Sequence, residues 1–196
     1  MIRLFKKNKI LFILCISTIL CFIGGILFNN FIDIETKNII NNNIINLIDN
    51  LNNDKISNFS NFFNLFFSSG IIIFIIWIFG ISIIGILFVF GIYLFKVFIC
   101  SFELISLVVN LKLNNFLYII IYFIPSIFNI FIFLFTTYYS LSLSFMLFKH
   151  LFIDKSINIK KLFLNYLRVF LIALFLSFIS SILEILIIPK LLLFLF

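Results

Sequence analysis

Charged residues are scarce in this sequence, and their scarcity indicates which class of protein it belongs to. Only 11% of its 196 residues are Asp, Glu, Lys or Arg, whereas a soluble domain carries about 25%. Hydrophobic residues make up 64%, and the mean hydropathy is +1.33. A water-soluble core is therefore excluded, and the composition predicts an integral membrane protein.

Residues that usually carry chemistry are equally scarce. The one histidine, His150, adjoins Lys149, and Cys15, Cys21 and Cys100 lie in apolar runs without CxxC spacing. That pattern favours small buried hydrophobic cysteines over disulfides or a metal site. A lone histidine at a predicted membrane edge favours a headgroup-level polar residue over a base or a ligand. No phosphate-binding glycine loop, H-E-x-x-H or paired acidic motif is present. We therefore expect no enzyme, no cofactor and no metal.

The chain carries a net charge of +7. A basic balance can indicate nucleic-acid binding, but these cations are not clustered on a soluble domain. In a membrane protein they report orientation instead. We expect the lipid bilayer as a partner, and no nucleic acid.

Long apolar runs predict a single all-α domain, a polytopic membrane helix bundle. A bilayer core about 30 Å thick requires about 20 helical residues. The first run follows a basic start but ends without a clear signal-peptide cleavage site, so an uncleaved span is expected. About five transmembrane helices are predicted, at residues 10–28, 70–95, 97–109, 126–148 and 164–188.

Two of these runs have awkward lengths. The stretch 97–109 has 13 residues, about 20 Å as a helix, so its flanking lysines must snorkel outward. The stretch 116–148 is too long to cross once, and Pro125 lies inside it. We therefore expect an interfacial or re-entrant half-helix at 116–124, followed by the span 126–148.

Charge then predicts the orientation. With five spans and the N-terminus inside, ten of the fourteen cations are cytoplasmic, as the positive-inside rule favours. They are Arg3, Lys6, Lys7, Lys9, Lys96, Lys149, Lys155, Lys160, Lys161 and Arg168. If 97–109 did not cross, five of them would move outside. The C-terminus is thus expected outside, with a basic cytoplasmic loop at 149–163.

The same orientation puts the polar segment 29–69 outside the cytoplasm. Its apolar residues recur at helical spacing, which predicts an amphipathic segment. Such a segment can lie in the membrane interface or meet a partner's outer domain. The alternative is a solvated linker with local helicity.

Small residues interrupt the uncharged run between Gly70 and Lys96, which we expect to be the packing centre of the bundle. In lipid, small residues such as those at 80, 82 and 85 let a neighbouring helix come close. The alternative is a lipid-facing helix with scattered glycines.

Two carboxylates, Glu103 and Glu184, fall inside predicted spans. A charge at that depth is costly, by roughly 2.5–3.5 kcal/mol for the comparable Asp. Structural roles are favoured: Glu103 is expected to bond nearby hydroxyls such as Ser101 or Ser106, and Glu184, close to Pro189, to stay at the outer interface. The alternatives are a proton or ion path, or a fixed contact with another subunit.

Two stretches and the overall layout resemble the stage II sporulation protein M family, integral membrane proteins of the engulfment machinery in endospore formers. IIWIFGISIIG at 75–85 is similar to that family's second span, and SSILEILIIP at 180–189 is similar to its closing segment. The layout is a basic start, one span, a polar loop of about forty residues and a hydrophobic remainder. The family's proline after Ser-Ile-Ile-Gly is replaced by Ile86 and Leu87.

The resemblance implies a non-enzymatic scaffold that gathers two peptidoglycan-degrading partners, stage II sporulation proteins D and P. It also implies a multi-pass protein of the septum and of the engulfing mother-cell membrane. The runner-up hypothesis is a transporter or channel subunit that uses Glu103 beside a proline-broken helix. Candidate packing or partner contacts are Trp77, Gly80, Ser82, Gly85, Glu103, Pro125, Ser180, Ser181, Glu184 and Pro189.

Overall fold

The computed structural model describes residues 9–32, 58–110, 116–152 and 159–187. Within these ranges the regular structure is all helical, and five helices are long and apolar enough to cross a membrane. The expected all-α, five-helix membrane bundle is therefore confirmed. In chain order the elements are α2 (Lys9–Phe28), α4 (Asn58–Gly80), α5 (Gly85–Asn110), α6 (Phe116–Phe152), α7 (Ile159–Ile182) and the π-helix η2 (Leu183–Ile187).

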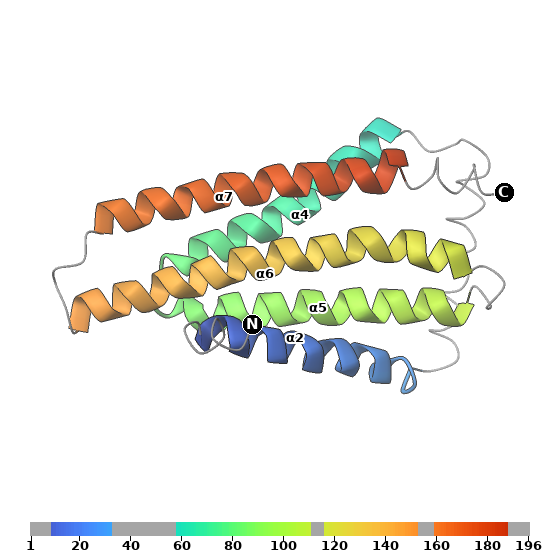
Figure 1. Ribbon diagram of the computed structural model, residues 1–196, viewed down its shortest axis with the longest axis horizontal. Coiled ribbons are helices and arrows are strands. Elements are labelled where there is room, and N and C mark those ends of the chain that lie inside the picture. Colours follow the sequence, from blue (N-terminus) through green and yellow to red (C-terminus); the bar gives the residue numbers. More distant parts are fainter. Residues whose placement is uncertain (1–8, 33–57, 111–115, 153–158, 188–196) are drawn as a thin grey trace.

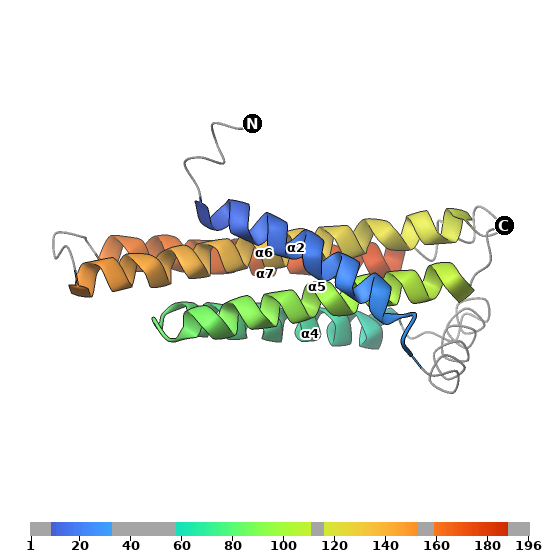
Figure 2. The same ribbon diagram turned by 90° about the horizontal axis from the view of Figure 1, so that it is seen from below.

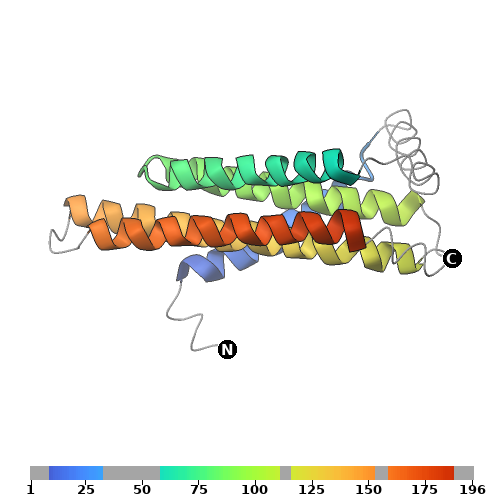
Figure 3. The same ribbon diagram turned by 90° about the horizontal axis from the view of Figure 1, so that it is seen from above.

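The helices form two layers with a fifth helix laid against them (Figure 1). The hairpin α4–α5 makes one layer and the hairpin α6–α7 makes the other, as Figure 3 shows from above. Helix α2 crosses obliquely over the α5 and α6 edge (Figure 2). Helix α6 contacts each of the other four helices, so α6 is the packing centre. The expected centre between Gly70 and Lys96 is wrong, because that run is divided between α4 and α5.

The bundle has apolar side chains both inside and outside, as a protein immersed in lipid requires. Its core is built from fully buried residues of several helices, among them Leu14, Ile73, Val89 and Ile132. Large apolar residues also cover the exterior, and Leu87 alone is 79% exposed. A water-soluble monomer rarely shows contiguous apolar surface on this scale. The exterior therefore indicates a bilayer environment.

The structure corrects the boundary between the second and third spans. The predicted span 70–95 is broken at 81–84, where α4 ends and α5 begins. The short span 97–109 is the second half of α5, which has 26 residues and needs no snorkelling to cross. The turn escapes a hydropathy argument because it consists of Ile, Ser, Ile and Ile, with no charge and no proline.

Lys96 consequently lies within α5 and not in a cytoplasmic loop. Without Lys96, nine cations are on the predicted cytoplasmic side and four are on the outer side. The other cations keep their sides because the number of spans is still five. The orientation with the N-terminus inside stays a prediction that the charge bias favours.

The remaining boundaries also shift. Helix α4 takes the last residues of the predicted outer segment 29–69, of which 33–57 lies outside the described residues. Helix α6 runs without a break through Pro125, so the separate half-helix at 116–124 is wrong. Proline removes only one backbone donor, and membrane helices tolerate it where neighbours cover the site. Pro125 is buried.

At the other end, α6 continues to Phe152 and α7 starts at Ile159, which narrows the predicted basic loop 149–163 to six residues between helices. The predicted last span, 164–188, corresponds to α7 and η2, which together cover 159–187.

The turn between α4 and α5 gives a stability prediction. A Cβ at Gly85 would collide with the backbone carbonyl of Phe79, whereas one at Gly91 would meet nothing within 4 Å. Overpacking costs about 1–3 kcal/mol, and a backbone neighbour cannot rotate away. Gly85→Ala should therefore lower the free energy of unfolding by about that amount, measured by denaturant titration in detergent micelles.

Gly91→Ala is the matched control, since it is the same substitution in the same helix. Its stability should be unchanged or slightly raised, because alanine is the better helix former. Equal effects of the two substitutions would contradict the packing of the turn.

Candidate functional site

The end of α4 is held by side chains from two other helices. The Tyr166 hydroxyl on α7 donates to the Trp77 carbonyl oxygen at 2.9 Å, and its oxygen accepts from the Ser140 hydroxyl on α6 at 2.7 Å. The Ile76 carbonyl oxygen lies 3.2 Å from the same Ser140 hydroxyl and can only share its one hydrogen. Three helices thus meet in one hydrogen-bonded group.

This group accounts for the backbone at the helix end. The last four carbonyls of a helix lack intrahelical partners, and in hydrocarbon each one must be satisfied within the protein. The carbonyl oxygen of Trp77 accepts from the Tyr166 hydroxyl. The carbonyl oxygens of Ile78 and Phe79 accept from the backbone amides of Ile81 and Ser82, both at 3.1 Å. The last, Gly80, accepts from Ser144 on α6 at 2.7 Å. All four carbonyls at the end of α4 are therefore paired.

Gly80 allows α6 and α7 to come close to the end of α4. A Cβ at Gly80 would collide with the hydroxyl of Tyr166 and come within 2.8 Å of the Ser140 Cβ. The carbonyl oxygen of Ser82 inside the turn lies 3.2 Å from the same Ser144 hydroxyl and can only share its one hydrogen with Gly80. We name Trp77, Gly80, Ser82, Gly85, Ser140, Ser144 and Tyr166 the turn clamp.

Aromatic rings cover the turn clamp on the α7 side. The Trp77 ring stacks on Tyr166, with centroids 5.9 Å apart, and lies against Phe170 at 4.9 Å. Phe163 and Phe74 complete the group. Trp and Tyr gather where hydrocarbon meets headgroups, so this group marks the level of one membrane interface on α4 and α7.

A second seam joins α2 to α5. The hydroxyls of Thr18 and Tyr93 lie 2.6 Å apart, and both side chains face the interior, with Tyr93 fully buried. A Cβ at Gly25 would collide with the side chain of Ser101. These contacts were not predicted, because a single Thr, a single Tyr and one of two adjacent glycines form no recognisable motif.

A third polar group lies toward the opposite end of the bundle. Lys96, Cys100 and Glu103 follow one another on α5 at spacings of four and three, which puts them on one helix face. The Cys100 thiol donates to the Ser126 carbonyl oxygen on α6 at 3.9 Å. Glu103 lies within electrostatic range of Lys96 and of Glu184 on η2. We name Lys96, Glu103 and Glu184 the charged triad.

These charges occupy different positions along α5. The helix runs from Gly85 to Asn110, so Lys96 lies near its middle, about 16 Å from Gly85 and about 21 Å from Asn110. Glu103 lies seven residues before Asn110. The sequence placed Glu103 in the centre of a short span, and the structure puts Lys96 in the central position instead.

The closing stretch of the chain packs back onto α6. Ser180 donates to the amide oxygen of Asn129 at 2.7 Å, and Ser181 donates to the Ser177 carbonyl oxygen on its own helix at 3.0 Å. Glu184 follows in the π-helical turn η2, a geometry that is frequent at functional sites. Pro189 lies outside the described residues.

The structure therefore divides the candidate residues between the two ends of the bundle. Trp77, Gly80, Ser82 and Gly85 meet in the turn clamp. Near the other end lie Glu103, Pro125, Ser180, Ser181 and Glu184. Sequence analysis missed Tyr166, the residue that ties α7 to α4, because it stands alone between charged residues and gives no pattern.

Fold and exterior together define a multi-pass membrane protein. Comparison of the chain with protein-family models, with curated proteins and with solved structures found no match. Within the described ranges, no group of three or more His, Cys, Asp or Glu residues is placed to hold a metal ion.

The turn clamp gives a second prediction. Tyr166→Phe removes the hydroxyl that reaches both Trp77 and Ser140 and leaves a carbonyl unpaired in an apolar setting. Measured bonds of this kind are worth about 0.6 kcal/mol each, with larger values for unsatisfied groups. We expect a loss of about 1–2 kcal/mol in unfolding free energy, measured by denaturant titration in micelles.

Tyr139→Phe provides the comparison, since Tyr139 is 39% exposed on α6 and exposed substitutions usually change stability by less than about 0.5 kcal/mol. A Tyr166→Phe protein as stable as Tyr139→Phe would mean that the clamp does not hold α4.

Proposed function

We propose that this chain is a non-enzymatic membrane scaffold of the engulfment machinery in endospore formation. In this proposal it recruits peptidoglycan hydrolases and keeps them at the septum. Support comes from the resemblance of 75–85 and 180–189 to the stage II sporulation protein M family. By the same resemblance the partners are stage II sporulation proteins D and P.

The observation that supports the proposal most is the packing of residues 75–85, the stretch that resembles the family. Gly80 packs closely against α6 and α7, Gly85 packs against the end of α4, and the carbonyls of Trp77 and Gly80 accept from Tyr166 and Ser144. Groups committed in this way fix the position of helices and are not available to act on a substrate. That use fits a protein whose task is to hold other proteins in place.

A scaffold also needs a surface that its partners can reach. The polar segment between α2 and α4 joins two helices at the end of the bundle away from the turn clamp (Figure 1). The charge bias predicts that this end faces outward, toward the cell wall. We propose that the segment captures the hydrolases and that the protein acts in the septal and engulfing membranes.

Deletion of part of this segment tests the proposal. Because α4 already begins at Asn58, a deletion that spares the bundle should remove residues 38–56 and replace them with a Gly/Ser linker of equal length. We expect loss of hydrolase capture in a pull-down from sporulating cells, while the variant remains membrane-inserted and folded. Full capture by the variant, or no hydrolase with the intact chain, would refute the scaffold role.

A specific observation favours a second candidate, a transporter or channel subunit. The charged triad contains a lysine at the middle of a span and two carboxylates within range of each other. Ionisable residues at such depth mark ion paths and proton relays in many membrane proteins. In this alternative, Glu103 would exchange a proton or cation with the outer side.

Glu103→Gln separates the two candidates. In liposomes carrying the purified protein, a transport role predicts that a proton or cation flux present in the parent protein falls by at least tenfold, with hydrolase capture unchanged. Glu35→Gln, the same change in the polar segment, serves as the control. A scaffold predicts no flux in the parent protein and normal capture by both variants.

A further inference from the structure

One end of the molecule extends beyond the rest. At the end that carries the turn clamp, α6 and α7 project past α2, α4 and α5, as Figure 1 shows on its left. Ser144 is level with Gly80, where α4 ends, and α6 continues eight residues further to Phe152, or about 12 Å. Likewise α7 begins seven residues before Tyr166, or about 10 Å beyond that residue. We name this projection, 145–152 with 159–165, the α6–α7 tip.

The tip combines two surface types that rarely occur together in water. Its apolar side chains are exposed, with Phe152 at 70% and Leu151 at 61%. Its cations are exposed as well: Lys149 near the end of α6, and Lys160 and Lys161 in the first turn of α7. An apolar surface in bulk water is costly, whereas the headgroup layer accepts both apolar bodies and cations.

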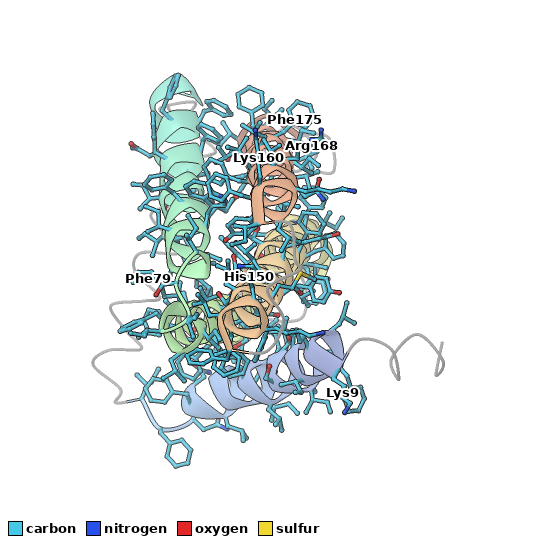
Figure 4. All side chains as sticks on the ribbon, turned by 90° about the vertical axis from the view of Figure 1, so that its left-hand side faces the viewer. Lys9, Phe79, His150, Lys160, Arg168 and Phe175 are labelled. Carbon is cyan, nitrogen blue, oxygen red and sulfur yellow. The ribbon has the colours of Figure 1, made fainter. Side chains whose placement is uncertain are left out.

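Figure 4 looks directly onto this end. Lys160 and Arg168 are on the α7 side, His150 is near the middle and Lys9 is at the α2 edge. Arg168 is exposed and lies two residues inside Tyr166. Helical side chains lean toward the N-terminus of their helix, so Arg168 on α7 leans toward the tip and the headgroups.

We propose that the α6–α7 tip is an anionic-lipid binding surface that lies in the headgroup layer and takes the phosphates of acidic phospholipids. Four cations project from its two helices: Lys149, Lys160, Lys161 and Arg168. A juxtamembrane cation is worth about fivefold in attraction to an anionic surface. The inference goes beyond the scaffold role and does not depend on it, because it rests only on the membrane fold.

The chain supplies its own reporter. Trp77 is the sole tryptophan and lies in the aromatic group directly beneath the tip. In vesicles, brominated lipids quench this fluorophore when they are adjacent to it. Quenching by brominated phosphatidylglycerol, compared with brominated phosphatidylcholine at equal mole fraction, measures how strongly acidic lipid is enriched there.

We expect a preference for phosphatidylglycerol of about fivefold or more at low salt, decreasing as salt rises because the attraction is screened. The triple variant Lys149→Gln, Lys160→Gln, Lys161→Gln should lower the preference severalfold, to the remainder that Arg168 supplies. The charge-keeping triple Lys→Arg should retain it. Quenching by brominated phosphatidylcholine should be equal in all proteins, which verifies that Trp77 keeps its place.

The matched control removes three cations elsewhere, at Lys37, Lys55 and Lys112, in segments joined to the opposite end of the bundle. This variant should keep the parent preference. A parent ratio near one, a glutamine triple that behaves like the parent, or an equal loss in the control would each overturn the proposal.

Discussion

The structure depends on pairing the backbone at the end of α4. There, four carbonyls lose their helical partners. Two are satisfied by the turn itself and two by hydroxyls from α6 and α7. The α4–α5 turn is therefore stabilised by α6 and α7. That dependence joins the two layers of the bundle, and it explains why α6, which supplies both serines, lies at the centre.

Close packing follows from the same requirement. A hydroxyl reaches a neighbour's backbone only when the helix axes come near, and Gly80 permits this by having no side chain. On α6, buried Ser140 and Ser144 are spaced by four and so lie on one face toward α4. Association in lipid lacks a hydrophobic drive and relies on such contacts. The polar residues of the interior thus act mainly to hold the helices together.

Much of the fold could be predicted from composition and span length, and the errors have physical causes. Five spans follow from five helix-lengths of apolar sequence, whichever way they are divided. The division at 81–84 was missed because hydropathy measures solvation, and an isoleucine turn is as apolar as an isoleucine helix. The short length of 97–109 could have indicated the error. Dividing residues 58–110 near the middle gives two helices of normal spanning length, 58–80 and 85–110.

The candidate residues show the same contrast. Trp77, Gly80 and Ser82 were found because they interrupt an apolar run, but their partner Tyr166 is remote in sequence and has no pattern of its own. Lys96 was placed in a loop because lysines usually end spans, and only the position of the turn puts it at mid-depth.

The charged residues at the two ends of the bundle lie in different surroundings. At the turn-clamp end, exposed cations stand beyond a ring of aromatic residues, where phosphate groups can neutralise them. Toward the other end, Lys96 and two carboxylates lie among apolar neighbours, where only protein groups or protons can do so. Since a buried charge without a partner is strongly unfavourable, the charged triad is unlike the cations of the tip. Lys96 can offset Glu103, whereas Glu184 in the π-helical turn lies within range of a second carboxylate. The triad holds two carboxylates and one lysine, so a proton or a group outside the triad is needed to balance it.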